Sequence, residues 1–384
     1  MDDLILQIRD LASKANDAEK IKIQSTLRAV ASDLESPQDT LMQLYNGCMY
    51  LAVVRIGTRS GLFRSLSQSQ GPLSVTQLAE QSNASPQLFE RITRYLAANQ
   101  LIEEVKQGYF KANRSTHVLG SQDAEVAVSH LSTFSVPAMQ AFPGFAHETG
   151  YTEVTNNLKT PFQKGFSTEL TVYDWLAQHP EAAERFKNMM KLTQSGGWML
   201  GFEEFNKEAL SAELHPETAF FVDVGGNSGH QCLAVLEKYP GLKGRLVLED
   251  LPQVITELPE IPGVRLEATD IFQEQKIKGA KFYYLRRILH NWPDNDCVQI
   301  LRNLRFSMAK DSRILIDDAV VPETNAPWQP ALADLAMMIM MGGKERTRTQ
   351  WAMLAEQAGL RIAHIHQYSN DLVNFHSVVV LALN

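Results

Sequence analysis

A glycine-rich turn between an expected buried strand and an expected helix carries the strongest local signal for ligand binding. The turn is the run Asp223-Val224-Gly225-Gly226-Asn227-Ser228-Gly229-His230. Glycines at such a turn let the backbone approach a ligand closely, and the N-terminus of the following helix favours negative charge. A dinucleotide-binding turn would instead show Gly-x-Gly-x-x-Gly around a pyrophosphate. Because an acid, Asp223, stands at the end of the strand here, the turn suits a cationic ligand group better than a phosphate.

Acids also follow the next two expected strands. Asp250 lies in Glu249-Asp250-Leu251-Pro252, and Asp270 lies in Thr269-Asp270-Ile271-Phe272. In a doubly wound fold, an acid after the second strand is placed to bond ribose hydroxyls, and the third strand end offers polar and apolar groups that could hold a base. Taken singly, Asp250 could cap a helix and Asp270 could cap a turn. Three acids at three successive strand ends favour a nucleoside site over that alternative.

His290 follows the fourth expected strand and lies near the same edge of the sheet. It belongs to the run Arg286-Arg287-Ile288-Leu289-His290-Asn291-Trp292-Pro293-Asp294. Two acids could orient it: Asp318, which ends the fifth expected strand, and Glu345, in Gly342-Gly343-Lys344-Glu345-Arg346-Thr347. A histidine oriented by carboxylates can act as a general base near neutral pH, whereas a lone histidine is more often structural.

These residues are positioned by an alternation of strands and helices in the C-terminal half. Strand-like apolar runs occur at residues 219–224, 246–249, 264–266, 280–285 and 313–317, and helical patterns occur at 231–239, 252–257, 294–309 and 347–358. The alternation predicts an α/β fold with a doubly wound, Rossmann-like, mostly parallel sheet that is covered on both faces. The last two runs, 360–366 and 377–383, are separated only by a polar link at Ser369-Asn370-Asp371. We therefore expect a closing antiparallel hairpin at the sheet edge.

The N-terminal third is expected to be all-helical apart from a winged-helix segment. Residues 3–33 and 38–66 carry apolar positions at helical spacing, and residues 74–113 combine two capped helices with a hairpin. A winged helix can bind DNA, or it can serve packing and dimerisation. We expect three regions: a helical and winged-helix dimerisation domain over 1–124, a helical substrate-side connector over 125–205, and a catalytic domain over 206–384.

Composition excludes several classes of protein. Of the 384 residues, 44% are apolar and 21% are charged, which is the balance of an ordinary globular protein. The net charge of −8 disfavours nucleic acid and anionic membranes as partners. The three cysteines, Cys48, Cys232 and Cys297, lack metal-ligand spacing, which argues against structural zinc or a disulfide framework. Since the N-terminus is acidic and no apolar run approaches the ~20 residues of a membrane span, we expect a cytoplasmic protein.

The ordered set of motifs resembles a known family. The glycine-rich turn, Asp250-Leu251-Pro252, the segment from His290 to Cys297, Asp318 with Pro322, and the run 342–347 look like those of the S-adenosylmethionine-dependent class I O-methyltransferases. The resemblance is to the plant caffeate and fungal secondary-metabolite type, with its pericyclase-like relatives, and spans nearly the whole chain. It implies S-adenosylmethionine as cofactor, a small apolar or aromatic metabolite as acceptor, and no metal. It also implies a dimerisation domain, and the apolar stretch 38–66 independently predicts a homodimer.

The resemblance implies a role for each matching residue. His290 would be the general base, with Asp318 and Glu345 beside it. The cofactor would be held by Asp223, Gly225, Gly226, Asp250, Leu251, Asp270, Ile271 and Arg286, the last standing where the family usually has a lysine. The acceptor pocket would be lined by Phe186, Met190, Met337 and Met338. His130 is a further candidate on the substrate side, although Ser129-His130-Leu131 also suits an ordinary helical segment. The expected reaction is methyl transfer to a phenolic or enolic hydroxyl, in which a base removes the proton and the protein aligns the reacting atoms.

Two residues depart from the family pattern and keep alternatives open. Asn227 replaces a glycine, although asparagine tolerates positive φ better than most residues. Asp318 is shorter than the glutamate usual at its position. A second interpretation therefore keeps the fold but replaces methyl transfer by a pericyclic or dehydrating cyclisation. Groups that could then polarise a carbonyl are His290, His130, Lys344 and Arg286. A third interpretation, a DNA-binding regulator, is disfavoured by the net charge of −8.

Overall fold

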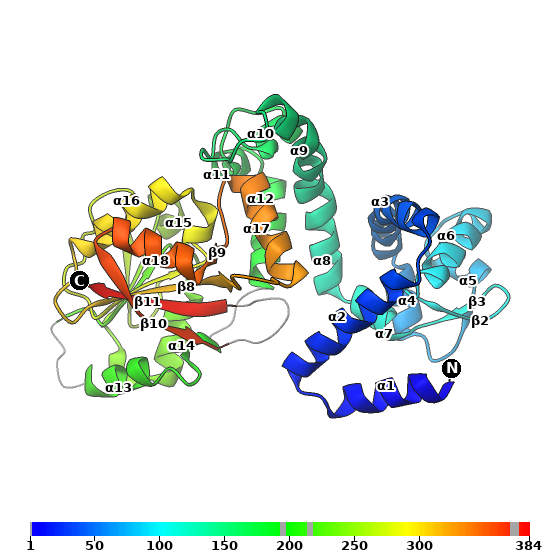
Figure 1. Ribbon diagram of the computed structural model, residues 1–384, viewed down its shortest axis with the longest axis horizontal. Helices are drawn as coiled ribbons and strands as arrows, with labels where there is room; N and C mark the ends of the chain where they lie inside the picture. Colours follow the sequence, from blue (N-terminus) through cyan, green and yellow to red (C-terminus); the bar gives the residue numbers. More distant parts are fainter. Residues whose placement is uncertain (1, 193–196, 213–217, 369–375) are drawn as a thin grey trace. The chain divides into compact units, whose positions relative to one another are not determined.

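The computed structural model describes residues 2–192, 197–212, 218–368 and 376–384 (Figure 1). The chain forms two compact units. The first, here called the sheet unit, comprises Met1–Ser25, Ala141–Val172 and Gln194–Asn384; the second, the winged unit, comprises Thr26–Gln140 and Tyr173–Thr193. The domain boundaries predicted after residues 124 and 205 remain predictions.

The sheet unit is built on an eight-stranded sheet in which one strand runs against the others. The order is β10-β11-β8-β7-β4-β5-β6, with β9 beside β8, and β11 runs antiparallel to both of its neighbours, β10 and β8. The strands are β4 (Phe221–Val224), β5 (Leu246–Asp250), β6 (Val264–Ala268), β7 (Phe282–Arg286), β8 (Arg313–Val321), β9 (Arg346–Thr347), β10 (Leu360–Gln367) and β11 (His376–Leu383). The predicted sheet and its closing hairpin are confirmed. The link at 369–371 lies outside the described residues.

The strand order fixes where a ligand can bind. From β4 the chain adds β5 and β6 on one side and then returns to add β7 and β8 on the other side. In open α/β sheets, ligands bind at the carboxyl ends of the strands where the order reverses in this way. The crevice is therefore expected at the ends of β4 and β7, with β5 next to them.

Helices on both faces of the sheet bury two apolar cores (Figure 1). One core includes Val222 with residues of α16 (Asp294–Arg305) and α18 (Arg348–Gln357). The other includes Phe221 with residues of α13 (Glu203–Ala212) and α14 (His230–Lys238). Because successive side chains of β4 enter opposite cores, the strand appears in the sequence as a continuous apolar run. Further elements of this unit are α1 (Asp2–Lys14), α10 (Pro161–Phe166), η2 (Gly197–Met199), η3 (Pro240–Leu242), α15 (Pro252–Glu257), η4 (Leu289–Asn291) and α17 (Trp328–Met341).

The winged unit contains the predicted pair of helices and hairpin. Helices α5 (Val75–Gln81) and α6 (Pro86–Ala98) begin at the caps Ser74 and Ser85, whose side chains accept backbone N–H bonds. Strand β3 (Tyr109–Lys111) pairs with both β1 (Leu73–Ser74) and β2 (Glu103–Lys106). The other elements are α3 (Pro37–Arg59), α4 (Leu62–Gln68), α7 (Arg114–Leu119), α8 (Gln122–His130), η1 (Leu131–Ser135) and α12 (Pro180–Lys191), while α2 (Asp17–Asp33), α9 (Val136–Glu148) and α11 (Val172–Ala177) contain the boundaries between the units. Within the described ranges, no helix has the length and apolar character needed to span a membrane.

Candidate active site

The glycine-rich turn after β4 is held against β5 by backbone hydrogen bonds. The N–H groups of Gly225 and Gly226 donate to the carbonyl oxygen of Glu249 at 2.8 and 3.1 Å. Gly225 has a φ of 73°, a left-handed conformation that favours glycine. A Cβ on Gly226 would lie 2.4 Å from Leu248 Cδ1. The turn therefore requires both glycines, the first for its backbone angle and the second for its close approach to β5.

Asp250 holds the next part of the same turn. Its Oδ2 accepts the Asn227 N–H at 2.8 Å, and its Oδ1 accepts the Leu251 N–H at 2.8 Å. Asn227 has a φ of 51°, so the expected tolerance of asparagine for this conformation is confirmed. Burial raises the pKa of Asp250, although the two N–H donors oppose the shift. Asp250 thus shapes the turn with the carboxylate that is predicted to bind the ribose.

Two further acids beside the turn are almost completely buried. Asp223 and Glu249 are each 1% exposed, and burial is the main cause that raises the pKa of each to about 7. Gln275 Nε2 donates to Glu249 Oε2 at 2.7 Å. Across the described segments, neither these two acids nor Asp250 forms an ion pair with a lysine or arginine. The charge of Arg286 offsets the rise in the pKa of Asp223 only in part, and carboxyl groups without an ion-pair partner suit a cationic ligand.

The residues predicted to hold the base lie just after β6. Asp270 Oδ1 accepts the Phe272 N–H at 2.9 Å. This is the turn-capping bond that the alternative interpretation of Asp270 predicts. The Ile271 carbonyl accepts a hydrogen bond from Asn303 Nδ2 at 3.2 Å. Asp270 and Ile271 line a small cavity with Glu249 and Thr269, and Thr269 Oγ1 is buried without a hydrogen-bond partner among the described residues. Capping therefore fixes Asp270 in place and leaves polar atoms facing a cavity.

Arg286 is tied to the neighbouring strand. Its Nη1 donates to Asp317 Oδ2 at 2.7 Å, and Asp317 also accepts the hydroxyls of Tyr284 and Tyr368 at 2.6 and 2.7 Å. His376 and Arg286 lower the pKa of Asp317, although its burial alone would raise it. The guanidinium thus joins β7 to β8, and its predicted contact with the cofactor stays a prediction.

His290 and Glu345 form a buried pair. His290 Nδ1 lies 2.8 Å from Glu345 Oε1, and the two side chains are 6% and 5% exposed. Burial would raise the pKa of Glu345, but the attraction to His290 and their hydrogen bond lower it overall. The Lys344 N–H donates to the His290 carbonyl at 2.9 Å, and Asp334 Oδ1 on α17 accepts the Glu345 N–H at 2.9 Å. Since Nδ1 faces Glu345, Nε2 is the nitrogen left to take a proton.

Asp318 differs from its expected position and partner. It was expected to end a strand, but β8 continues to Val321 because residues 318–321 pair with β11 and β9. The side chain is fully buried, and neither carboxylate oxygen has a hydrogen-bond partner within the described chain. Burial raises the pKa of Asp318 to about 7, while His290 opposes the shift. Of the two acids predicted beside His290, only Glu345 therefore bonds to it.

Comparison with known proteins shows the family. Residues 151–361 match the model of the O-methyltransferase domain, and residues 42–121 match that of the O-methyltransferase dimerisation domain. The chain belongs to the O-methyltransferase family. The resemblance and the enzyme class predicted from the sequence are confirmed.

Similar proteins cover nearly the whole of this O-methyltransferase. Demethylsterigmatocystin 6-O-methyltransferase of Aspergillus flavus is 36% identical over 96% of this chain and 95% of its own length. The O-methyltransferase lepI of the same species is 34% identical over 96% and 95%. Two solved structures, one described as a pericyclic reaction enzyme and one as LepI in complex with S-adenosylmethionine, each share 34% identity and a TM-score of 0.87 over 99% of this chain and 98% of theirs. The fold and the cofactor expected for the family are confirmed, and the roles of individual residues stay predictions.

The residues predicted to line the acceptor pocket of this O-methyltransferase fall in both compact units. In the winged unit, the His130 ring lies 5.0 Å from that of Phe134 and 5.8 Å from that of Phe186, measured between centroids. Burial and the nearby Arg185 lower the pKa of His130. The adjacent η1 is a π-helical turn, a feature frequent at functional sites. The methionines are partly buried, Met190 on α12 of the winged unit and Met337 and Met338 on α17 of the sheet unit.

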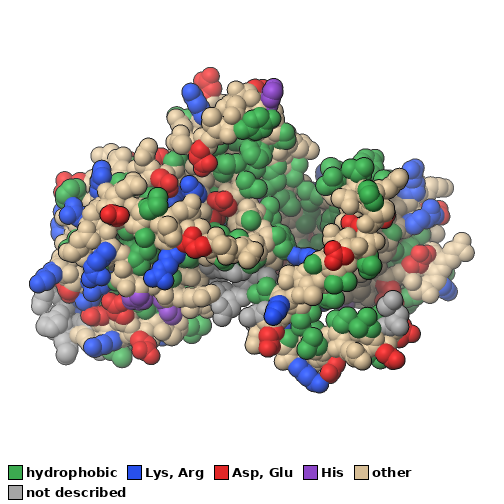
Figure 2. All heavy atoms as spheres, viewed as in Figure 1, with side chains coloured by type: hydrophobic (Ala, Val, Ile, Leu, Met, Phe, Trp, Pro, Cys, Tyr) green, Lys and Arg blue, Asp and Glu red, His purple; other side chains and the backbone are tan. Residues whose placement is uncertain are grey.

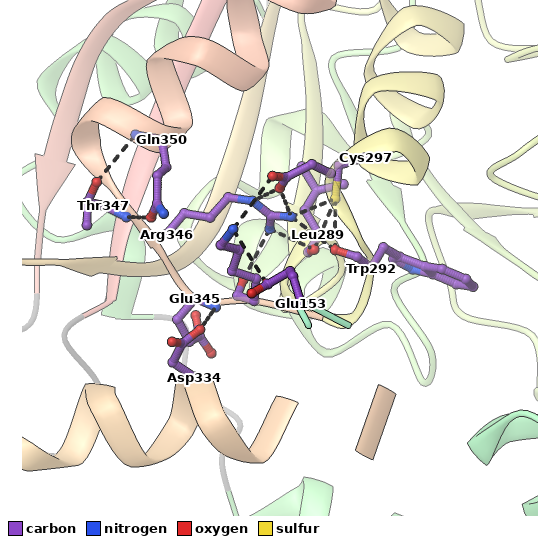
Figure 3. A network of polar contacts seen from close by, with 11 residues as sticks. Glu153, Leu289, Trp292, Cys297, Asp334, Glu345, Arg346, Thr347 and Gln350 are labelled. Atoms are coloured by element: carbon purple, nitrogen blue, oxygen red, sulfur yellow. Dashed lines mark hydrogen bonds and ion pairs between the residues drawn. The ribbon is translucent and has the colours of Figure 1, made fainter. Parts of the chain in front are cut away.

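Sequence reasoning missed two residues that support the His290–Glu345 pair. Asp334 carries no motif, because its bond to Glu345 depends on how α17 packs. Arg346 belongs to the run 342–347 but received no role. Its position directly after Glu345 was the available signal, and its buried hydrogen bonds are drawn in Figure 3.

Proposed function

We propose that this O-methyltransferase transfers the methyl group of S-adenosylmethionine to a phenolic or enolic hydroxyl of a small apolar secondary metabolite, with His290 as the general base. The observation that carries the proposal is the buried 2.8 Å contact between His290 Nδ1 and Glu345 Oε1. His290 follows β7, and the glycine-rich turn follows β4, so both stand after the carboxyl ends of adjacent parallel strands. The relative solved with S-adenosylmethionine supports the cofactor.

The acids at the strand ends fit a cationic nucleoside. When bound, S-adenosylmethionine supplies a methyl group that its sulfonium already activates. We assign Asp223, Gly225, Gly226 and Arg286 to the methionine side, Asp250 and Leu251 to the ribose, and Asp270 and Ile271 to the adenine. The absence of a lysine or arginine partner for Asp223 and Asp250 within the described segments supports the assignment, since a bound cation would stabilise their ionised forms.

The protein then has to remove one proton and hold the acceptor. With the Nδ1–H donated to Glu345, the imidazole carries its lone pair on Nε2, which can accept the proton of the acceptor hydroxyl. Glu345 stabilises the imidazolium that forms, and its lowered pKa keeps it ionised for that task. Positioned bases of this kind typically contribute about 10²–10⁴-fold to a rate.

The predicted acceptor-lining residues fit a flat apolar molecule. The aromatic group around His130 and Phe186 offers ring faces, and the predicted methionines offer flexible, polarisable side chains that adapt to different shapes. We therefore expect the acceptor to be an aromatic or enolised polycyclic metabolite rather than a charged one.

A labelled-methyl assay tests the proposed function. The protein is mixed with S-adenosylmethionine labelled in its methyl group and a panel of phenolic and enolic polyketides, and methylated product and S-adenosylhomocysteine are measured together. We expect equal amounts of both from at least one acceptor. His290→Ala should lose the product, whereas His364→Ala, on the edge strand β10, should keep it. Product formation that survives in His290→Ala would remove His290 from its role.

A second candidate function is a pericyclic or dehydrating cyclisation. The observation that favours it is the 34% identity and TM-score of 0.87 to a structure described as a pericyclic reaction enzyme. In this case an unsaturated precursor would cyclise in the presence of S-adenosylmethionine without forming S-adenosylhomocysteine. Mass spectrometry separates the two functions, because cyclisation leaves no methyl group on the product.

We also propose that the protein is a homodimer. Helix α3 exposes large apolar side chains, including Leu41 and Leu44 at 68% and Tyr45 at 66%, and hydrophobic side chains gather over this helix in Figure 2. This face begins the segment that matches a dimerisation domain. Leu44→Asp should shift the mass measured by light scattering toward the monomer, whereas Leu210→Asp, at an equally exposed leucine on α13, should not. A monomeric wild-type protein at micromolar concentration would contradict the proposal.

A further inference from the structure

Arg346 is a buried cation that directly follows the predicted catalytic acid. Its side chain is 1% exposed, and each of its guanidinium nitrogens donates to acceptors (Figure 3). Nε and Nη2 both donate to Asp294 Oδ1, at 2.9 and 2.7 Å. The other acceptors are the carbonyls of Leu289 and Lys344, each 3.1 Å from Nη1, and that of Trp292, 3.0 Å from Nη2.

The carbonyl groups that Arg346 binds lie on both sides of His290. Leu289 precedes His290 directly, and Trp292 follows it by two residues, so one guanidinium holds both ends of the η4 turn. Cys297 on α16 joins the same group. Its thiol lies within donating distance of the Leu289 carbonyl at 3.2 Å and accepts from Arg346 Nη2 at 3.4 Å. The backbone that carries the imidazole is therefore fixed through side-chain bonds as well as through its own turn.

The segment that carries Glu345 packs against the same turn. The Lys344 N–H donates to the His290 carbonyl at 2.9 Å. A Cβ on Gly343 would lie 2.0 Å from that oxygen, so the contact is possible only with glycine. Through its bonds to the carbonyls of Lys344 and Leu289, Arg346 joins the two segments a second time. These ties fix the separation between the two side chains of the pair.

We propose that Arg346 is the positioning residue for the base: it locks the η4 turn to residues 343–346 and so places His290 Nδ1 against Glu345. The proposal rests on the proposed function of His290 as general base. It assigns Arg346 no contact with the acceptor or the cofactor. Asp294 and Cys297 hold the guanidinium in place.

The chemistry of the guanidinium explains why arginine stands here. Its planar fork presents five N–H donors in fixed directions, and this site uses donors on all three nitrogens. A lysine at this position would keep the charge, but its single ammonium could not reach the carboxylate and the three carbonyls together. Arg346→Lys therefore separates the geometry of the fork from its charge, and Arg346→Met removes both.

Histidine NMR combined with steady-state kinetics tests the proposal. Protein labelled with ¹⁵N-histidine should show a downfield Nδ1–H signal from the His290–Glu345 hydrogen bond, assigned by its loss in His290→Ala. Arg346→Lys should shift or broaden this signal and lower kcat by about tenfold or more, because small misplacements of a catalytic group are costly. The KM for S-adenosylmethionine should stay near that of the wild type. Arg348→Met, which changes an exposed arginine two residues away, is the matched control and should alter none of these values.

Two further variants keep the test decisive. If Arg346→Met fails to fold, Asp294→Asn, at a side chain 52% exposed, removes the negative charge beside the guanidinium, together with the 3.7 Å ion pair of Asp294 with Lys344, and should give a smaller shift of the same signal. An unchanged Nδ1–H signal and an unchanged kcat in every folded variant would overturn the proposal. Because the NMR signal does not depend on turnover, failure to find a methylated product would count against the proposed function and would leave the role of Arg346 to be judged by the NMR.

Discussion

The acids at the ends of β4 and β5 and the acid beside His290 are all buried, but their surroundings drive their ionisation in opposite directions. Burial raises the pKa of Asp223 and of Glu249 to about 7, and no lysine or arginine in the described chain pairs with either of them. Glu345 is also buried, yet its pKa is lowered because His290 bonds to it. Asp223 thus forms no ion pair among the described residues, although the charge of Arg286 partly offsets the rise of its pKa, whereas Glu345 has a hydrogen-bonded partner in His290.

This difference indicates which parts of the site are complete in the protein alone. The His290–Glu345 pair and Arg346 already form their hydrogen bonds, so the base is preorganised. Asp223 is costly to ionise until a further positive charge arrives. The cofactor would supply that charge, and its binding would then complete the electrostatics of the site.

The largest effect is expected on the preorganised side. His290→Ala should lower kcat by about 10²–10⁴-fold, because no other group in the pair can take the acceptor proton. Its affinity for S-adenosylmethionine should stay near that of the wild type. The measurement is steady-state kinetics beside a cofactor titration. A large loss of cofactor affinity in this variant would show that His290 also takes part in cofactor binding, and would contradict the separation of the His290–Glu345 pair from the acids at the strand ends.

A smaller effect is expected for the acid that shapes the turn. Asp250→Asn keeps the size of the side chain but removes its charge and one of its two acceptor oxygens. Since the lost bond holds Asn227 or Leu251, cofactor affinity should fall by about tenfold, the equivalent of roughly 1.4 kcal/mol. Fluorescence titration measures the change. Glu267→Gln, an acid at a less buried position of β6, is the control and should bind the cofactor normally.

The protein without cofactor should show the cost of the buried acids as a dependence of stability on pH. The pKa of Asp223 is 3.8 as a free side chain and about 7 in the folded protein. Below the lower value both states hold the proton, so stability does not change. As pH rises between the two values, only the unfolded chain releases the proton, and the free energy of unfolding falls by roughly 1.4 kcal/mol for each pH unit.

Asp223→Asn removes this titration. The variant should match the wild type near pH 4 and should be more stable at about pH 8, by roughly 2 kcal/mol or more. Urea unfolding at the two pH values measures the difference. A variant that is less stable than the wild type at the higher pH would show that the ionised Asp223 is already well solvated or paired in the folded protein.

The smallest effect is expected from Glu249→Gln. Glu249 holds the glycine turn through its backbone carbonyl, which the substitution leaves in place. Its side chain bonds only to Gln275 among the described residues. Cofactor affinity should therefore change by less than about threefold, or roughly 0.7 kcal/mol. A larger loss would assign the Glu249 side chain a direct part in binding.

The fold was predictable because its signals are local or periodic. Runs of apolar residues between helical patterns fixed the strands of the sheet, and Ser74 and Ser85 marked two helix starts. The end of β8 was not predictable. Asp317 and Asp318 look like the end of a strand, but buried bonds from Tyr284, Arg286 and other side chains let the charged Asp317 continue inside the sheet.

The candidate site was predictable where motif and position coincide, and unpredictable where partners are distant in the chain. The 2.8 Å contact of His290 with Glu345 joins residues that the motifs had singled out. Arg346 bonds to Asp294, which lies 52 residues earlier. Neither hydrophobic periodicity nor residue propensity predicts the Arg346–Asp294 pair, because the pair depends on how distant segments pack in three dimensions.

The central claim is that the acids at the strand ends bind the cofactor, whereas the His290–Glu345 pair does not. The most direct test is a calorimetric titration of S-adenosylmethionine into the wild type, Asp223→Asn and Glu345→Gln at one pH. We expect one saturable site per chain, weaker binding in Asp223→Asn, and unchanged binding in Glu345→Gln. No heat of binding in the wild type, or weaker binding in Glu345→Gln than in Asp223→Asn, would contradict it.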